Sequence, residues 1–217
     1  MPNKSNINAQ KSLQLLKDGN HRFVSNLKMN RDLLMQMNET KDGQKPFAAI
    51  VSCMDSRTSA ELIFDQGLGD IFSIRIAGNI ISTGILGSLE YATAVAGSNL
   101  IMVLGHSNCG AIKGACDHVQ LGNLTSLLSE IKPAVDKENT VQDNRNSSND
   151  EFVQAVAELN VKHSVDEIMN RSEIINDLVK QGRVGIAAGM YDVSTGSVTF
   201  LDQYSIMPEA VAMAEQA

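Results

Sequence analysis

Four short apolar runs, separated by segments of helical character, constrain the fold of this chain more than any other feature of its sequence. They occupy residues 47–51, 71–76, 100–104 and 184–188. Runs of this length that are apolar on both faces are typical of parallel strands covered by helices on both sides of a sheet. A further run at 198–201 follows turn residues at 194–196 and suggests a hairpin. The sequence therefore predicts an α/β fold with a mainly parallel central β-sheet, an antiparallel edge strand and flanking helices.

Helical segments are expected between these strands. Apolar spacing favours helices at 59–65, 85–96, 124–135, 151–169 and 172–181. The polar stretch at 137–150 is rich in Asn, Asp and Ser, and we expect it to be a solvated surface connection rather than a domain boundary. At 217 residues, the chain has the length of a single domain with a full core, 1–217.

Residues 1–42 are predicted to form a helical arm on a core that extends over residues 43–217. A second helix of this arm, at 31–41, is expected to end before Gly43 and Pro46. The first helix has an apolar stripe, which consists of Ala9, Leu13, Leu16, Phe23, Val24 and Leu27. A helix with one apolar face has to bury that face, either against its own domain or against a partner subunit.

Composition excludes several classes of partner. The formal net charge of -7 argues against binding to nucleic acid or to an anionic membrane, because nothing would offset phosphate repulsion. The apolar stretches are too short to span a bilayer, and residues 1–10 lack the apolar core of a signal peptide, so a cytoplasmic protein is expected. In a reducing compartment, an odd set of three cysteines favours metal ligands or reactive thiols over disulfides.

Two cysteine-containing motifs directly follow the first and third apolar runs. Because the carboxyl ends of parallel strands form one crevice, the two motifs are expected to meet there. Two thiolates and one imidazole suit Zn²⁺, and three protein ligands leave open the fourth position that a catalytic zinc needs. Buried structural cysteines are the alternative, but they would leave His106, Asp55 and Arg57 unexplained. The motifs are Cys53-Met54-Asp55-Ser56-Arg57 and His106-Ser107-Asn108-Cys109-Gly110.

Asp55 and Arg57 are predicted to form a catalytic pair beside the metal. The guanidinium of Arg57 can hold the Asp55 carboxylate in a bidentate pair, so that Asp55 accepts a hydrogen bond from zinc-bound hydroxide and orients it. Released from Arg57, Asp55 could instead become a fourth zinc ligand and close the site. A simple surface ion pair is the alternative. Two thiolate ligands cancel the charge of the ion, so we expect a bound-water pKa above about 7.

At these motifs the chain closely resembles the β-class carbonic anhydrases, from the arm at 19–23 to the strand near Tyr191. Further matching stretches lie at 61–67, 75–79 and 105–110. The resemblance implies reversible hydration of CO₂ to bicarbonate and a proton by zinc-bound hydroxide. It implies one Zn²⁺ per subunit on Cys53, His106 and Cys109, with Asp55 and Arg57 as the catalytic pair.

The resemblance also implies a substrate pocket and an oligomer. By position, the pocket residues of the family fall on Gln44, Phe72 and Tyr91, partly contributed by the neighbouring subunit. A fourth position, often valine, is Ala77 here, so the apolar wall is expected to be roomier. A homodimer or tetramer is implied, with the N-terminal helices packed over the partner.

Some family members bind bicarbonate at an inhibitory pocket of tryptophan, arginine and tyrosine. Arg75 and Tyr191 match, but Ile50 replaces the tryptophan and the chain has no tryptophan. We therefore expect the open, water-bound type without bicarbonate inhibition. Two alternatives stay open: hydrolysis of carbonyl sulfide or carbon disulfide on the same scaffold, and a non-catalytic zinc-binding module.

Overall fold

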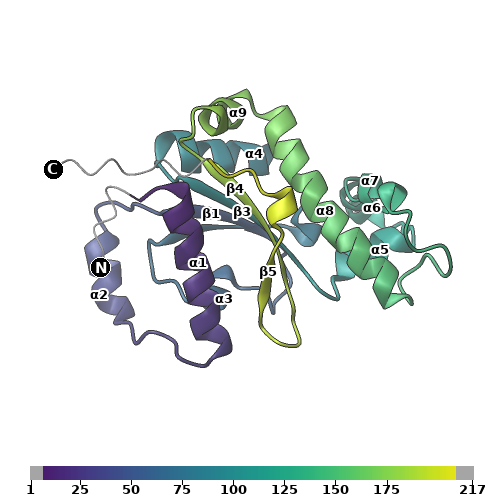
Figure 1. Ribbon diagram of the computed structural model, residues 1–217, viewed down its shortest axis with the longest axis horizontal. Coiled ribbons are helices and arrows are strands. Elements are labelled where there is room, and N and C mark those ends of the chain that lie inside the picture. Colours follow the sequence, from purple (N-terminus) through teal and green to yellow (C-terminus); the bar gives the residue numbers. More distant parts are fainter. Residues whose placement is uncertain (1–6, 209–217) are drawn as a thin grey trace.

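A five-stranded sheet lies at the centre of the computed structural model, which describes residues 7–208 (Figure 1). The strand order is β2-β1-β3-β4-β5; the first four strands run parallel and β5 pairs antiparallel with β4. This confirms the predicted fold class and the edge hairpin. The strands are β1 (Ala48–Ser52), β2 (Ile71–Arg75), β3 (Leu100–His106), β4 (Gly185–Tyr191) and β5 (Val198–Phe200).

Helices cover both faces of this sheet. α1 and α3 pack on one face with Leu16 and Phe64, and α4, α5, α7, α8 and α9 pack on the other. The helices are α1 (Ala9–Val24), α2 (Leu33–Thr40), α3 (Ala60–Ile63), α4 (Thr83–Glu90), α5 (Gly110–Cys116), α6 (Gly122–Ser129), α7 (Lys132–Lys137), α8 (Asp150–Arg171) and α9 (Glu173–Lys180). Short turns η2 (Ala77–Asn79), η3 (Tyr91–Val95) and η4 (Asp202–Tyr204) complete the described elements.

Two predicted helices differ from the structure. The segment expected at 124–135 is split into α6 and α7, because Pro133 has no N–H to bond the carbonyl of Ser129. The segment expected at 85–96 is α4 followed by a wider turn of the π type, in which Ala96 N donates to the Tyr91 carbonyl at 2.9 Å. This wider turn gives the end of the segment a different rotation from a continuous α-helix.

The expectation that all four parallel strands are buried on both faces is wrong for β2. β1, β3 and β4 are buried along their whole length, whereas β2 alternates, with Ser73 and Arg75 exposed. β2 lies at the edge of the sheet and is paired with β1 alone. One of its faces therefore has no covering layer among residues 7–208.

The arm is fastened to the core by the residues 19–23. Gly19 is required by a close approach, since a Cβ there would lie 1.8 Å from the Phe64 carbonyl oxygen. The Asn20 amide donates to the carbonyls of Ile63 and Gly196 and accepts from Val198 N. α1 thus packs on its own sheet, and the packing of the arm over a partner subunit stays a prediction.

α2 and the segment before it expose apolar side chains instead. Leu27, Leu33, Leu34 and Met37 are between half and three-quarters exposed, at 67%, 54%, 70% and 50%. The division into an arm at 1–42 and a core at 43–217 stays a prediction, and residues 1–6 and 209–217 lie outside the described part. Within residues 7–208, no helix has both the length and the apolar composition needed to cross a membrane. The cytoplasmic location stays a prediction.

Asp65, which follows α3, joins the arm to the core through charge. Its buried carboxylate accepts from Arg22 Nε, from an Arg31 guanidinium nitrogen and from Met29 N. Burial raises the pKa of Asp65, but these hydrogen bonds outweigh it and leave the pKa below its usual value. The carboxylate is therefore ionised, and the path of the chain between α1 and α2 depends on it.

Replacing Asp65 by asparagine should lower the free energy of unfolding by about 2–4 kcal/mol, because two arginines lose their anionic partner. Because the folded-state pKa is lowered, the carboxylate stabilises the protein above the usual carboxyl pKa of about 4 and loses this effect as pH falls. Urea unfolding at pH 7 and pH 3 should therefore show that the wild type and Asp65→Asn differ less in their free energy of unfolding at pH 3 than at pH 7. Asp18→Asn, at an exposed position of α1, is the control. An equal loss of unfolding free energy at pH 7 in the Asp65 and Asp18 variants would contradict the prediction.

Candidate metal centre

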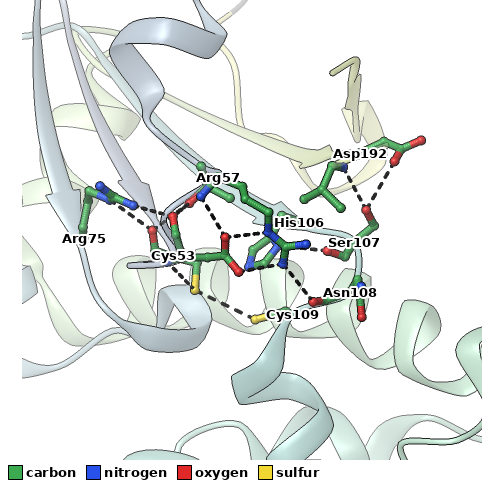
Figure 2. A network of polar contacts seen from close by, with 11 residues as sticks. Cys53, Arg57, Arg75, His106, Ser107, Asn108, Cys109 and Asp192 are labelled. Atoms are coloured by element: carbon green, nitrogen blue, oxygen red, sulfur yellow. Dashed lines mark hydrogen bonds and ion pairs between the residues drawn. The ribbon is translucent and has the colours of Figure 1, made fainter. Parts of the chain in front are cut away.

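The two predicted motifs meet at the carboxyl ends of β1 and β3 (Figure 2). Cys53 directly follows β1, His106 ends β3, and Cys109 lies at the start of α5. The three donor atoms lie within 4.8 Å of one another and all three residues are buried. The sulfur atoms of Cys53 and Cys109 are 3.9 Å apart. Two Zn–S bonds of about 2.3 Å at a tetrahedral angle would place them about 3.8 Å apart.

The ring of His106 is oriented by its neighbour. Its Nδ1 lies 2.9 Å from the Ser107 carbonyl oxygen, so this nitrogen carries the proton and Nε2 has a free lone pair. Nε2 is buried without a hydrogen-bond partner among the described residues 7–208. Such an atom costs about 1–3 kcal/mol unless a ligand satisfies it. A cation bound jointly by Nε2 and the two sulfur atoms would satisfy it, so the residues fit a metal ion.

The two thiols influence each other's ionisation. A hydrogen bond from the Cys109 thiol lowers the pKa of Cys53 against the opposing effect of burial, and the Asp55 amide also donates to the Cys53 sulfur, at 3.4 Å. The pKa of Cys109 is raised, because its thiol donates to Cys53 and is buried. The pair holds one negative charge, and a divalent cation would replace the second proton. Cys116 lies apart, and burial raises its pKa to about 11.

Asp55 and Arg57 form the predicted pair. Arg57 Nε lies 2.9 Å from Asp55 Oδ1 and a second guanidinium nitrogen lies 2.7 Å from Oδ2, while the Arg57 amide also donates to Oδ1. The Arg57 side chain holds the pKa of Asp55 well below its usual range. The guanidinium also approaches the Asn108 carbonyl at 3.5 Å, which links the two motifs.

Arg75, at the end of β2, lies against the loop that carries Cys53. Its guanidinium donates to the carbonyls of Cys53, at 3.2 Å, and Asp55, at 2.6 Å. Ile50, which stands at the tryptophan position of the inhibitory pocket, is fully buried in the core, and Tyr191 is 6% exposed; the absence of that pocket stays a prediction. Through its two hydrogen bonds Arg75 supports the backbone of the loop that carries Cys53 and Asp55.

Comparison with known proteins identifies the family. Residues 48–198 match the family model described as carbonic anhydrase. The chain is also 35% identical over 219 residues to carbonic anhydrase 2 of Mycobacterium tuberculosis, across 97% of this chain and 100% of that protein. This chain belongs to the β-carbonic anhydrase family. It is a carbonic anhydrase, and the family is one of zinc enzymes that hydrate CO₂.

Solved β-carbonic anhydrases share the fold of this enzyme. The Coccomyxa β-carbonic anhydrase in complex with acetazolamide aligns with a TM-score of 0.69 and 26% identity, over 77% of each chain. A tetrameric β-carbonic anhydrase of Sordaria macrospora aligns with a TM-score of 0.66 and 24% identity, over 77% of this chain and 89% of that chain. The second likeness concerns the fold alone.

The predicted pocket residues of this carbonic anhydrase do not all lie at the same end of the sheet. Phe72 and Tyr91 pack edge to face with centroids 6.2 Å apart and line a hollow of about 380 Å³. Tyr91 is 53% exposed and so is no core aromatic, and Ala77 is half-buried at the start of η2. Gln44 is exposed and precedes β1, whereas Cys53 follows it. The pocket role of these residues stays a prediction.

Three polar residues that hold the backbone around the metal centre are not recognised from the sequence alone. The sequence places Arg75 only in the inhibitory pocket and gives no role to Asn160 and Ser164, which are buried in α8. The available signal was their spacing of four residues within an otherwise apolar helix face, which marks polar groups with a specific partner.

Cys109→Ala and His106→Ala should each lose stoichiometric zinc, because every remaining pair of donors is too few to hold the ion at nanomolar free zinc. Equilibrium dialysis against a zinc buffer followed by elemental analysis measures the bound metal. Cys116→Ala is the matched control, as it removes another buried thiol and should bind as the wild type does. Full zinc occupancy in Cys109→Ala would show that the ligands have been assigned wrongly.

Proposed function

We propose that this enzyme hydrates CO₂ reversibly to bicarbonate and a proton at one Zn²⁺ per subunit, held by Cys53, His106 and Cys109. The observation that carries the proposal is the buried group of three donors beside the ionised Asp55. When bound, the ion supplies a Lewis acid that makes hydroxide available near neutral pH. The intact pair of Asp55 and Arg57 argues against a non-catalytic zinc-binding module.

The chain itself contributes a fixed hydrogen-bond acceptor. Asp55 is ionised and both of its oxygens are held by Arg57, so it can accept a hydrogen bond from the attacking nucleophile and direct a lone pair of that nucleophile at CO₂. Ligation of a metal by Asp55 would require this bidentate pair to break. The pairing supports an open, water-bound site, which we propose as the resting state together with the absence of the inhibitory bicarbonate pocket.

The substrate pocket is proposed to need two chains. Phe72, Ala77 and Tyr91 would supply an apolar wall for CO₂, and the hollow beside Tyr91 is open to solvent in a single chain. Gln44 lies before β1, away from the Cys53 end, so its amide would serve the centre of a partner. The exposed apolar side chains of α2 offer a surface for that partner. We propose a homodimer, with a tetramer formed by pairing of dimers.

Hydrolysis of carbonyl sulfide or carbon disulfide is the second candidate. Both are linear molecules with an electrophilic carbon, like CO₂, and Ala77 in place of a larger valine leaves room for a sulfur atom. Relative kcat/KM values for CO₂ and carbonyl sulfide, measured on the same zinc-loaded protein, decide between them.

Stopped-flow hydration of CO₂ by the zinc-loaded protein should rise between pH 6.5 and 9. Two thiolates offset the charge of the zinc ion, so the water that the ion would activate is expected to lose its proton above about pH 7. Asp55→Asn should lower kcat/KM by about 10²–10⁴-fold while zinc stays bound. A flat rate at the level of the buffer, with stoichiometric zinc, would contradict the proposal.

A mixture of two inactive variants tests the shared pocket. If Gln44 of one chain serves the metal of the other, Gln44→Ala and Cys109→Ala subunits should complement each other after unfolding and refolding together. Random pairing makes half of the dimers mixed, with one intact site each, so about a quarter of the wild-type sites should return. The same mixture assembled from separately refolded dimers is the control. Activity no higher than the mean of the two parents would place Gln44 in its own subunit's site or outside any site.

A further inference from the structure

Two buried polar residues lie on the face of α8 that packs against the sheet. Asn160 is 1% exposed and Ser164 is 2% exposed, and their neighbours on this helix, including Val161, Val165 and Ile168, belong to the apolar core. Polar groups are buried at a cost unless they are hydrogen-bonded. Asn160 and Ser164 are therefore expected to have specific hydrogen-bond partners within the core.

Both side chains bind the turn that follows β2. Asn160 Nδ2 donates to the Gly78 carbonyl at 2.8 Å, and Ser164 Oγ donates to the Asn79 carbonyl at 3.0 Å. Asn79 Nδ2 lies 3.4 Å from Ser164 Oγ and completes the network. Gly78 and Asn79 both have positive φ, 66° and 45°. For Asn79 this conformation is strained, so the turn needs support from outside.

The same turn, at Gly78 and Asn79, also lies against the residues that lead into the metal centre. The Ile76 amide donates to the carbonyl of Ser52, the residue before Cys53, at 3.1 Å. A Cβ on Gly78 would lie 3.3 Å from Ala111, two residues after Cys109. The Gly78 amide lies close enough to the Cys53 sulfur to contribute to the lowered pKa of that thiol. Gly78 itself cannot be replaced without a shift, since a Cβ would lie 2.6 Å from the Ile131 side chain. The orientation of the Gly78 N–H thus depends on how the peptides on both sides of Gly78 are held.

We propose that Asn160, supported by Ser164, is a positioning residue for the metal centre: it fixes the turn at Gly78 so that the Gly78 amide is aimed at the sulfur of Cys53. Asn160 touches neither metal nor substrate and acts through two peptide groups. An N–H···S bond withdraws electron density from a thiolate ligand and fixes its direction. Outer-shell contacts of this kind change metal affinity or activity by about 10–100-fold. The inference rests on the proposed metal site.

Co²⁺ is the probe, because its thiolate charge-transfer bands report electron density at sulfur. In Asn160→Leu, the sulfur loses an oriented donor, so these bands should move to lower energy and the affinity for Co²⁺, measured by competition with a chelator, should fall about tenfold or more. Ser164→Ala should shift both readouts in the same direction by less. This milder variant carries the test if Asn160→Leu does not fold.

Ser172→Ala is the matched control for these variants. Ser172 is also buried, at 1% exposure, and its hydroxyl bonds Glu90 and the amide of Ile175, away from the turn. It should lose stability while its Co²⁺ spectrum and affinity match the wild type. Spectra and affinities of the α8 variants within twofold of the wild type, with a stability loss like that of Ser172→Ala, would overturn the inference. A wild-type chain that binds no Co²⁺ would overturn the metal site as well.

Discussion

The parallel pairing of β1 with β3 is the constraint on which the rest of the site depends. Its register sets Ser52 beside Leu104, so the residues that follow the two strands leave the sheet at the same edge. Cys53 and His106 are brought together by backbone hydrogen bonds alone, and the short turn to α5 adds Cys109. No residue of the cluster needs a flexible loop to reach the others, which favours a preorganised centre.

Charge then decides how these groups are used. Two buried thiols cannot both ionise at close range without a cation, whereas Asp55 stays ionised because Arg57 takes both of its oxygens. The sulfur atoms can therefore act as anionic metal ligands, whereas the Asp55 carboxylate acts as a hydrogen-bond acceptor. The backbone behind them is held by Arg75 on one side and by α8 on the other.

The surfaces that a single chain leaves uncovered support the proposed assembly into a dimer. β2 is an edge strand with one open face, Tyr91 is half-exposed beside it, and α2 carries exposed leucine and methionine side chains. In contrast, the arm is firmly attached to its own core through Gly19, Asn20 and the ionised Asp65. A rigid arm with an apolar outer face is suited to docking a second copy, because little order is lost on association.

The sequence by itself determined the α/β class, the strands, the three donor residues and the pair of Asp55 and Arg57. These depend on local apolar runs, on the rule that strand ends converge, and on spacings of a few residues. Only the tertiary structure decided that β2 is an edge, that Arg75 binds carbonyls of the metal loop and that Asn160 binds Gly78. Those partners lie 20 to 82 residues apart or are backbone atoms without a sequence signature. Their contacts arise from packing, which no local pattern of side chains records.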